Sequence, residues 1–243
     1  MASTETDAPD ERGRRADAFP ARVGGLLCLD FANTADGRRT NQPGEYLGSY
    51  ARLVAWSQVV GSLSDGQAAA LLERAAERPS LAGNAYRTAI SLREAIYRLC
   101  SAVAAHQPPK AADLDRLRHL YTIALAAGQL VPDQTATLRW SWAAEPVPHD
   151  LRWPLWPVAH SAVELATSAD LRGRLKECPG GEGPCSWLFV DQTKNASRRW
   201  CRMRSCGNIA KSRRQTQTRR AQRGRPGRAA PTPAPAVARG RSG

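Results

Sequence analysis

Apolar residues recur every three or four positions through most of the chain before Cys178, a pattern typical of amphipathic helices. The clearest stripe joins Ala85 to Val103 and predicts a long helix from about Gly83 to His106. Ser64 followed by Gln67 is a capping-box signal, which predicts a helix that ends near Arg78. Shorter stripes predict further helices around Leu47–Trp56, after Pro108–Pro109, and from about Pro157 to Ser168.

Two segments have the patterns of strands. A nearly continuous apolar run from Val23 to Asn33 predicts a buried strand. Leu138, Trp140 and Trp142 alternate with more polar residues, which predicts a strand with an aromatic face. The region from about residue 21 to 172 is therefore expected to be a mainly helical α+β domain with a few strands.

Asp30 and Asn33 are polar exceptions within the first apolar run. At a strand end that faces a cleft they could bind a small ligand. Asp and Asn also commonly cap turns, and capping is the role we favour.

The six cysteines fall into two groups. Cys28 and Cys100 have no neighbouring His or Cys partner in sequence and are expected to be buried thiols. The other four form a C-x6-C pair and a C-x4-C pair, which begin at Cys178 and end at Cys206 and are separated by the segment from Ser186 to Trp200. Two close pairs are the usual way in which structural zinc receives four tetrahedral ligands.

Disulfides or unpaired core thiols are the alternatives to zinc. The segment from Met1 to Arg15 contains no apolar run typical of a signal peptide, so we expect a reducing cytoplasm, where disulfides are rare. We therefore predict that Zn2+ is bound.

The sequence between the cysteine pairs predicts a small hairpin. Trp187 to Val190 has the pattern of a strand, Thr193 to Ala196 that of a turn, and Arg198 to Cys201 that of a return strand. A helix is expected to follow Gly207-Asn208, which gives a treble-clef-like order of elements. A segment this small would draw most of its folding free energy, about 10 kcal/mol or more, from the metal. Its core is expected to contain Trp187, Phe189 and Trp200, which could instead stack on bases.

The formal net charge of +13 is concentrated at one end of the chain. From Cys178 onward Lys and Arg outnumber Asp and Glu by 15 to 2, whereas the chain before this cysteine contains 20 of each sign. Such asymmetry is typical of a nucleic-acid-binding end on a neutral domain. A membrane surface is a poorer partner because no apolar face accompanies the charge. The predicted contact residues are Arg198, Arg199, Arg202, Arg204, Lys211, Arg213, Arg214, Arg219, Arg220, Arg223 and Arg225.

The two ends of the chain have the composition of disordered segments, residues 1–20 and 224–243. Within the second, Arg223-Gly224-Arg225-Pro226 resembles the core of an AT-hook, which lies in the minor groove of A·T-rich DNA.

Three further motifs surround the cysteines: Cys185 to Asp191, Ser197 to Cys201 and Cys206-Gly207-Asn208. In order and spacing they resemble the CGNR zinc-finger family of bacterial transcription regulators, and Leu27 to Thr34 is similar to the opening motif of the ABATE-type domain of that family. The resemblance implies that Cys178, Cys185, Cys201 and Cys206 bind zinc and that the basic residues around them bind DNA. Ile209 stands where the motif has arginine, so a DNA contact by that arginine does not transfer.

The sequence therefore predicts an ABATE-like domain over residues 21–172, a zinc finger with a basic helix over 173–223, and a disordered tail. The predicted function is that of a zinc-dependent, DNA-binding transcription regulator in the cytoplasm, associated with the nucleoid. Its first domain would sense a small-molecule effector or form a homodimer. An RNA-binding or ribosome-associated protein is the alternative, because phosphates do not distinguish DNA from RNA. No catalytic motif is present, and His160 with Glu164 is expected to be an ordinary helix pair, so we do not predict an enzyme.

Overall fold

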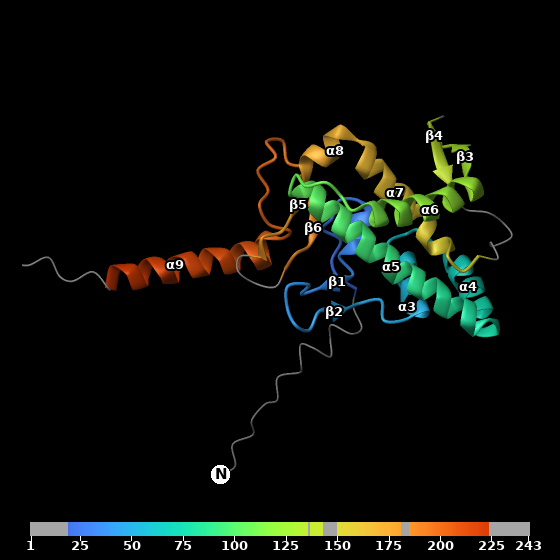
Figure 1. The fold of residues 1–243 in the computed structure, drawn as a ribbon, viewed down its shortest axis with the longest axis horizontal. Helices are drawn as coiled ribbons and strands as arrows, with labels where there is room; N and C mark the ends of the chain where they lie inside the picture. Colours follow the sequence, from blue (N-terminus) through green and yellow to red (C-terminus); the bar gives the residue numbers. More distant parts are fainter. Residues whose placement is uncertain (1–18, 136, 143–149, 181–184, 224–243) are drawn as a thin grey trace, which may run out of the picture.

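The computed structural model describes residues 19–135, 137–142, 150–180 and 185–223 (Figure 1). Helices dominate the described chain, and the strands form three separate two-stranded antiparallel sheets. The helices are α2 (Leu27–Ala32), α3 (Tyr50–Val59), α4 (Asp65–Glu77), α5 (Pro79–Ala104), α6 (Ala111–Ala127), α7 (Trp156–Thr167), α8 (Ala169–Arg174) and α9 (Asn208–Arg223), with a 3-10 turn η1 (Trp153–Leu155) and a π-helical turn η3 (Met203–Gly207). The strands pair as β1 (Ala35–Asp36) with β2 (Gly44–Glu45), β3 (Gln129–Pro132) with β4 (Leu138–Ser141), and β5 (Leu175–Glu177) with β6 (Leu188–Val190).

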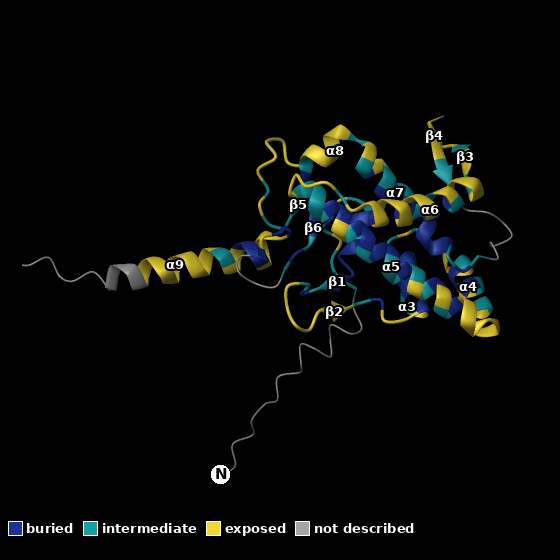
Figure 2. Cartoon of the chain, in the orientation of Figure 1, coloured by how far each residue is buried: buried dark blue, intermediate teal, exposed yellow. Residues whose placement is uncertain are grey.

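The long helix α5 runs through the middle of the molecule and contacts α2, α3, α4 and α6 (Figures 1 and 2). Its predicted apolar stripe, which includes Leu92, Ile96 and Leu99, is buried. Pro79 occupies its first turn, where a proline fits because the first N–H groups of a helix have no partner within it. The helix predicted from this stripe is confirmed.

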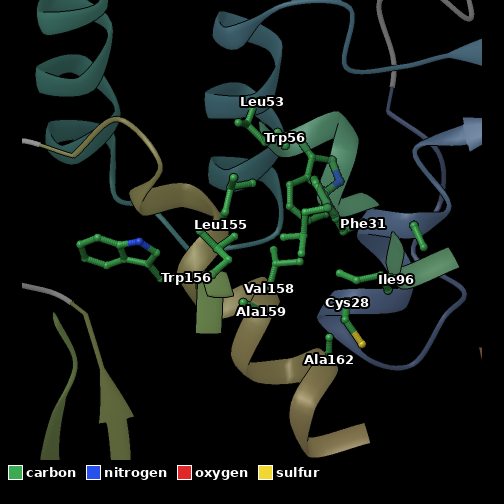
Figure 3. Packing of buried hydrophobic residues seen from close by; sticks show 14 of the residues in the cluster. Cys28, Phe31, Leu53, Trp56, Ile96, Leu155, Trp156, Val158, Ala159 and Ala162 are labelled. Atoms are coloured by element: carbon green, nitrogen blue, oxygen red, sulfur yellow. The ribbon is translucent and has the colours of Figure 1, made fainter. Parts of the chain in front are cut away.

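The strand predicted from Val23 to Asn33 is wrong, because its central part is the short helix α2. The Cys28 N–H donates to Ser161 Oγ of α7 at 3.2 Å, and the rings of Phe31 and Trp56 lie 5.2 Å apart between centroids (Figure 3). A short buried apolar run fits a strand or a helix equally well by periodicity. The helix packs against α5 and α7 and satisfies its backbone polar groups internally, while the neighbouring strand β6 is bonded by the Gly24 carbonyl and the Asn33 side chain at either end of the run.

Other predictions for this domain are confirmed. Ser64 and Gln67 form both hydrogen bonds of the capping box at the start of α4. His160 and Glu164 form the predicted pair one turn apart on α7, with 3.3 Å between His160 Nε2 and Glu164 Oε1. Cys28 and Cys100 are buried, and burial raises the pKa of the Cys28 thiol to about 12.

Some sequence predictions lie outside the described residues. They are the two disordered ends and the AT-hook-like segment with Arg225. In the part of the chain that the structure describes, no helix combines the length and hydrophobicity needed to cross a bilayer.

Candidate metal centre and nucleic-acid interface

The first cysteine pair is positioned by the hairpin of β5 and β6. Leu175 lies opposite Val190, and the ladder continues past the strand ends, where the Cys178 N–H donates to the Trp187 carbonyl at 2.8 Å. The partner of β6 is therefore the segment that precedes the cysteines. The predicted return strand from Arg198 to Cys201 is wrong, since no strand is found there.

The buried carboxylate of Asp191 explains this difference. It accepts hydrogen bonds from the Arg198 N–H and Lys176 Nζ, each at 2.7 Å, and from the hydroxyl of Thr193 at 2.6 Å. Burial raises the pKa of this carboxyl, but these hydrogen bonds outweigh burial and hold the pKa well below its usual range. The chain after β6 is thus fixed by hydrogen bonds to the Asp191 side chain instead of by backbone pairing between strands. Sequence reasoning missed this role, although a polar residue directly after a buried strand was a signal for it.

The four predicted metal ligands come together in one cluster. Their Sγ atoms all lie within 4.8 Å of one another, with 3.5 Å between Cys185 and Cys201 and 3.6 Å between Cys201 and Cys206. Tetrahedral zinc with bonds of about 2.3 Å separates its sulfur ligands by about 3.8 Å. A disulfide needs about 2.05 Å, and all four thiols are free. The donor set and its spacing therefore fit Zn2+.

Hydrogen bonds within the cluster already favour one thiolate. Those from Cys185 and Cys201 lower the pKa of Cys178, and the same hydrogen bonds raise the pKa values of both donors. A divalent cation would stabilise all four thiolates, because binding of the metal releases the thiol protons.

A small apolar core surrounds the cluster, as predicted. Phe189 is fully buried beside the cysteines, while Trp187 and Trp200 pack against them and are partly buried. The Arg198 guanidinium stacks 4.2 Å from the Phe189 ring centre and donates to the carbonyls of Cys201 and Val23. Arg198 is therefore partly buried and bound to the backbone of the finger, and its contact with nucleic acid stays a prediction.

The finger is built onto the helical domain. Leu188 and Val190 belong to the main hydrophobic core, and the Val190 N–H donates to the Gly24 carbonyl at 2.9 Å. Asn33 pairs with the backbone of Leu188 through both its amide oxygen and its amide nitrogen. Asp30 accepts a hydrogen bond from the Gly24 N–H at 2.8 Å. Both side chains are engaged with backbone groups, and their binding of a small ligand stays a prediction.

Helix α9 begins directly after the last cysteine and extends away from the body of the protein (Figures 1 and 2). The turn η3, which carries Cys206, is its main packing partner among the described elements. The helix has six basic residues and no acidic one, and its residues from 211 to 219 are all exposed. Arg199, Arg202 and Arg204 are exposed next to the cysteine cluster. The side chains of Arg220 and Arg223 are outside the described part.

The dipole of helix α9 suits its position beside the thiol cluster. The N-terminus of α9 carries the positive end of the helix dipole and lies at the thiol cluster, where negative charge is favourable. Ile209, at the position where the CGNR motif has arginine, is 43% exposed and adds no charge.

Comparison with protein-family models agrees with this architecture. Residues 174–220 match the CGNR zinc finger. Residues 25–169 match the ABATE model, described as "Putative stress-induced transcription regulator". No curated protein is significantly similar in sequence. Because the second match covers more than half of the chain, the protein belongs to the ABATE family and carries a C-terminal CGNR zinc finger.

Proposed function

We propose that this protein is a zinc-dependent transcription regulator that binds double-stranded DNA through α9 and the exposed arginines beside the cysteine cluster. Zinc held by Cys178, Cys185, Cys201 and Cys206 fixes the start of α9 relative to the helical domain. The helical domain senses a small-molecule effector or brings two copies of the chain together.

The isolated basic helix is the observation that carries this proposal. A helix of 16 residues is about 24 Å long, which is enough to lie along a DNA groove. A helix that is polar on every side gains no packing energy in water and is marginal alone. Its charge density suits phosphates, which supply affinity that depends strongly on salt. Binding to a polyanion would offset the mutual repulsion of the basic residues.

A pocket in the helical domain supports the sensing role. It has a volume of about 440 Å³, within the range of about 300–1,000 Å³ that is usual for small-molecule sites. Its lining includes Arg139 and Trp140 of β4, Trp142 directly after that strand, and Trp153 of the turn before α7.

Fluorescence anisotropy with labelled duplex DNA at several salt concentrations tests the proposal. The logarithm of the binding constant should fall linearly with the logarithm of salt concentration, by about 0.9 per phosphate contact. A variant with Lys211→Ala, Arg214→Ala and Arg219→Ala should bind at least about tenfold more weakly at 0.1 M salt and should show a smaller slope. The matched control carries Arg87→Ala, Lys110→Ala and Arg118→Ala, which remove the same charge from exposed positions of the helical domain.

Three outcomes would contradict the proposal. If the control variant lost as much affinity for duplex DNA, net charge alone would explain binding and α9 would have no special role. Tighter binding of structured RNA than of duplex DNA would favour the RNA-binding alternative. Absence of any binding above about 0.1 M salt would favour a protein whose finger is only structural.

A further inference from the structure

Glu177 directly precedes the first cysteine and is bound by two distant parts of the helical domain. Its Oε1 accepts from Arg39 Nη2 at 2.6 Å and from the Tyr97 hydroxyl at 3.2 Å, while its Oε2 accepts from Ser101 Oγ at 2.5 Å. Tyr97 and Ser101 lie one turn apart on α5. The backbone that enters Cys178 is therefore tied to the long helix α5.

Arg39 makes a second contact that reaches the other cysteine of the pair. Its Nη1 donates to the Cys185 carbonyl at 3.2 Å, while its Nη2 binds Glu177. One guanidinium thus spans the two chain segments that deliver Cys178 and Cys185. The planar fork of arginine is suited to this, because it presents two donors in a fixed geometry.

The contacts hold the ends of the segment between Cys178 and Cys185 close together. Closing a chain segment costs conformational entropy, and a site that is closed in advance leaves less of this cost for the metal. The Glu177 side chain is only 18% exposed, and its hydrogen bonds from Tyr97 and Ser101 are partly shielded from water, whereas Arg39 is 45% exposed. Groups that orient metal ligands in this way commonly change metal affinity by about 10- to 100-fold.

We infer that Arg39 and Glu177 are positioning residues for zinc, and that the loop between β1 and β2 together with α5 forms an outer shell of the metal centre. The affinity for zinc is then a property of the helical domain as well as of the four cysteines. A ligand or partner that displaces Arg39 or α5 would act directly on the finger. The inference rests on the proposed ligand set and is independent of DNA binding.

Competition for zinc between the full chain and a chromophoric chelator measures this effect. Arg39→Ala and Glu177→Gln should each weaken zinc binding by about 10-fold, the lower end of the usual range, because neither residue touches a sulfur atom. The double variant should be little weaker than the worse single one, since the two side chains act as one unit. Arg118→Ala and Glu164→Gln remove exposed side chains of the same types elsewhere and should stay within about twofold of wild type.

Arg39→Lys keeps the positive charge but replaces the planar fork with a single ammonium nitrogen, so it should still bind zinc more weakly than wild type. Circular dichroism of the zinc-saturated proteins checks that helix content is unchanged. If Arg39→Ala loses helix content, Arg39→Lys and Ser101→Ala take its place in the comparison. Zinc affinities equal to those of the two controls would overturn the inference. Stoichiometric zinc in Cys201→Ser would instead show that the ligand set is wrong.

Discussion

The side-chain amide of Asn33 pairs with the backbone of Leu188 as a neighbouring strand would. Its Nδ2 donates to the Leu188 carbonyl and its Oδ1 accepts from the Leu188 N–H, both at 2.9 Å. Asn33 is 2% exposed and Leu188 is fully buried, so no water competes for these bonds. The pair joins the end of α2 to β6 and makes the finger continuous with the core of the helical domain.

Replacing Asn33 with alanine should destabilise the protein by about 3 kcal/mol, because both backbone groups of Leu188 lose their partners in a buried place. Urea unfolding followed by circular dichroism measures the loss. Asn84→Ala is the control, since that side chain is exposed on α5, and should change the free energy of unfolding by less than about 0.5 kcal/mol. If Asn33→Ala lowered the free energy of unfolding no more than this control does, the Asn33–Leu188 pair would contribute nothing to stability.

Cys201→Ser should abolish stoichiometric zinc binding, as measured by elemental analysis of the purified protein. The sequence alone suggests that the whole finger would unfold beside an intact helical domain. Because Leu188 and Val190 are part of the main core, we now expect β5 and β6 to remain paired. Hydrogen exchange should increase after Asp191 and through α9 and should change little in β6. Rapid exchange throughout β6 would contradict this expectation.

Gly180 cannot accept a larger residue without disturbing the metal centre. Its φ of +68° is unfavourable for other residues, and a Cβ atom would lie 2.7 Å from the Cys185 carbonyl oxygen. Gly180→Ala should therefore cost about 1–3 kcal/mol of stability and weaken zinc binding. Gly173→Ala in α8 meets open space and should be neutral or slightly stabilising. Equal thermal unfolding temperatures for the two variants would disprove the steric argument.

The pair of Glu45 and Arg93 predicts a pH dependence of the helical domain. Burial raises the pKa of the Glu45 carboxyl, but two hydrogen bonds of 2.7 Å from buried Arg93 outweigh it, so the pKa lies below its usual value. The stabilisation of the folded protein by ionised Glu45 is therefore fully present above about pH 4.3, the pKa of an unperturbed Glu. It is lost as the pH falls through the folded-state pKa of Glu45.

Glu45→Gln should therefore be less stable than wild type at pH 7, and the difference should shrink as the pH falls to about 3. Urea midpoints followed through helix circular dichroism from pH 3 to 7 provide the measurement. Glu73→Gln, at an exposed position of α4, is the control and should change the midpoint little. A difference for Glu45→Gln that stays constant with pH would contradict the role given to its charge.

The sequence alone determined the features that depend only on residue type and on spacing between near neighbours. The stripe on α5 and the capping box of α4 depend on neighbours within one or two helical turns. The four cysteines are identified by thiol chemistry and pair spacing, and the basic character of α9 by charge alone. Such signals need no knowledge of distant segments, which explains why α5, the cap of α4 and the grouping of the four cysteines were predicted correctly.

Tertiary structure decided the features that depend on a distant partner. The run containing Phe31 forms a helix that packs between α5 and α7. The chain at Arg198 does not pair with β6, because its N–H donates to the Asp191 carboxylate instead. Asn33 finds its partner 155 positions away. Local periodicity contains no information about such contacts, because the partner of a buried polar group is set by packing in space.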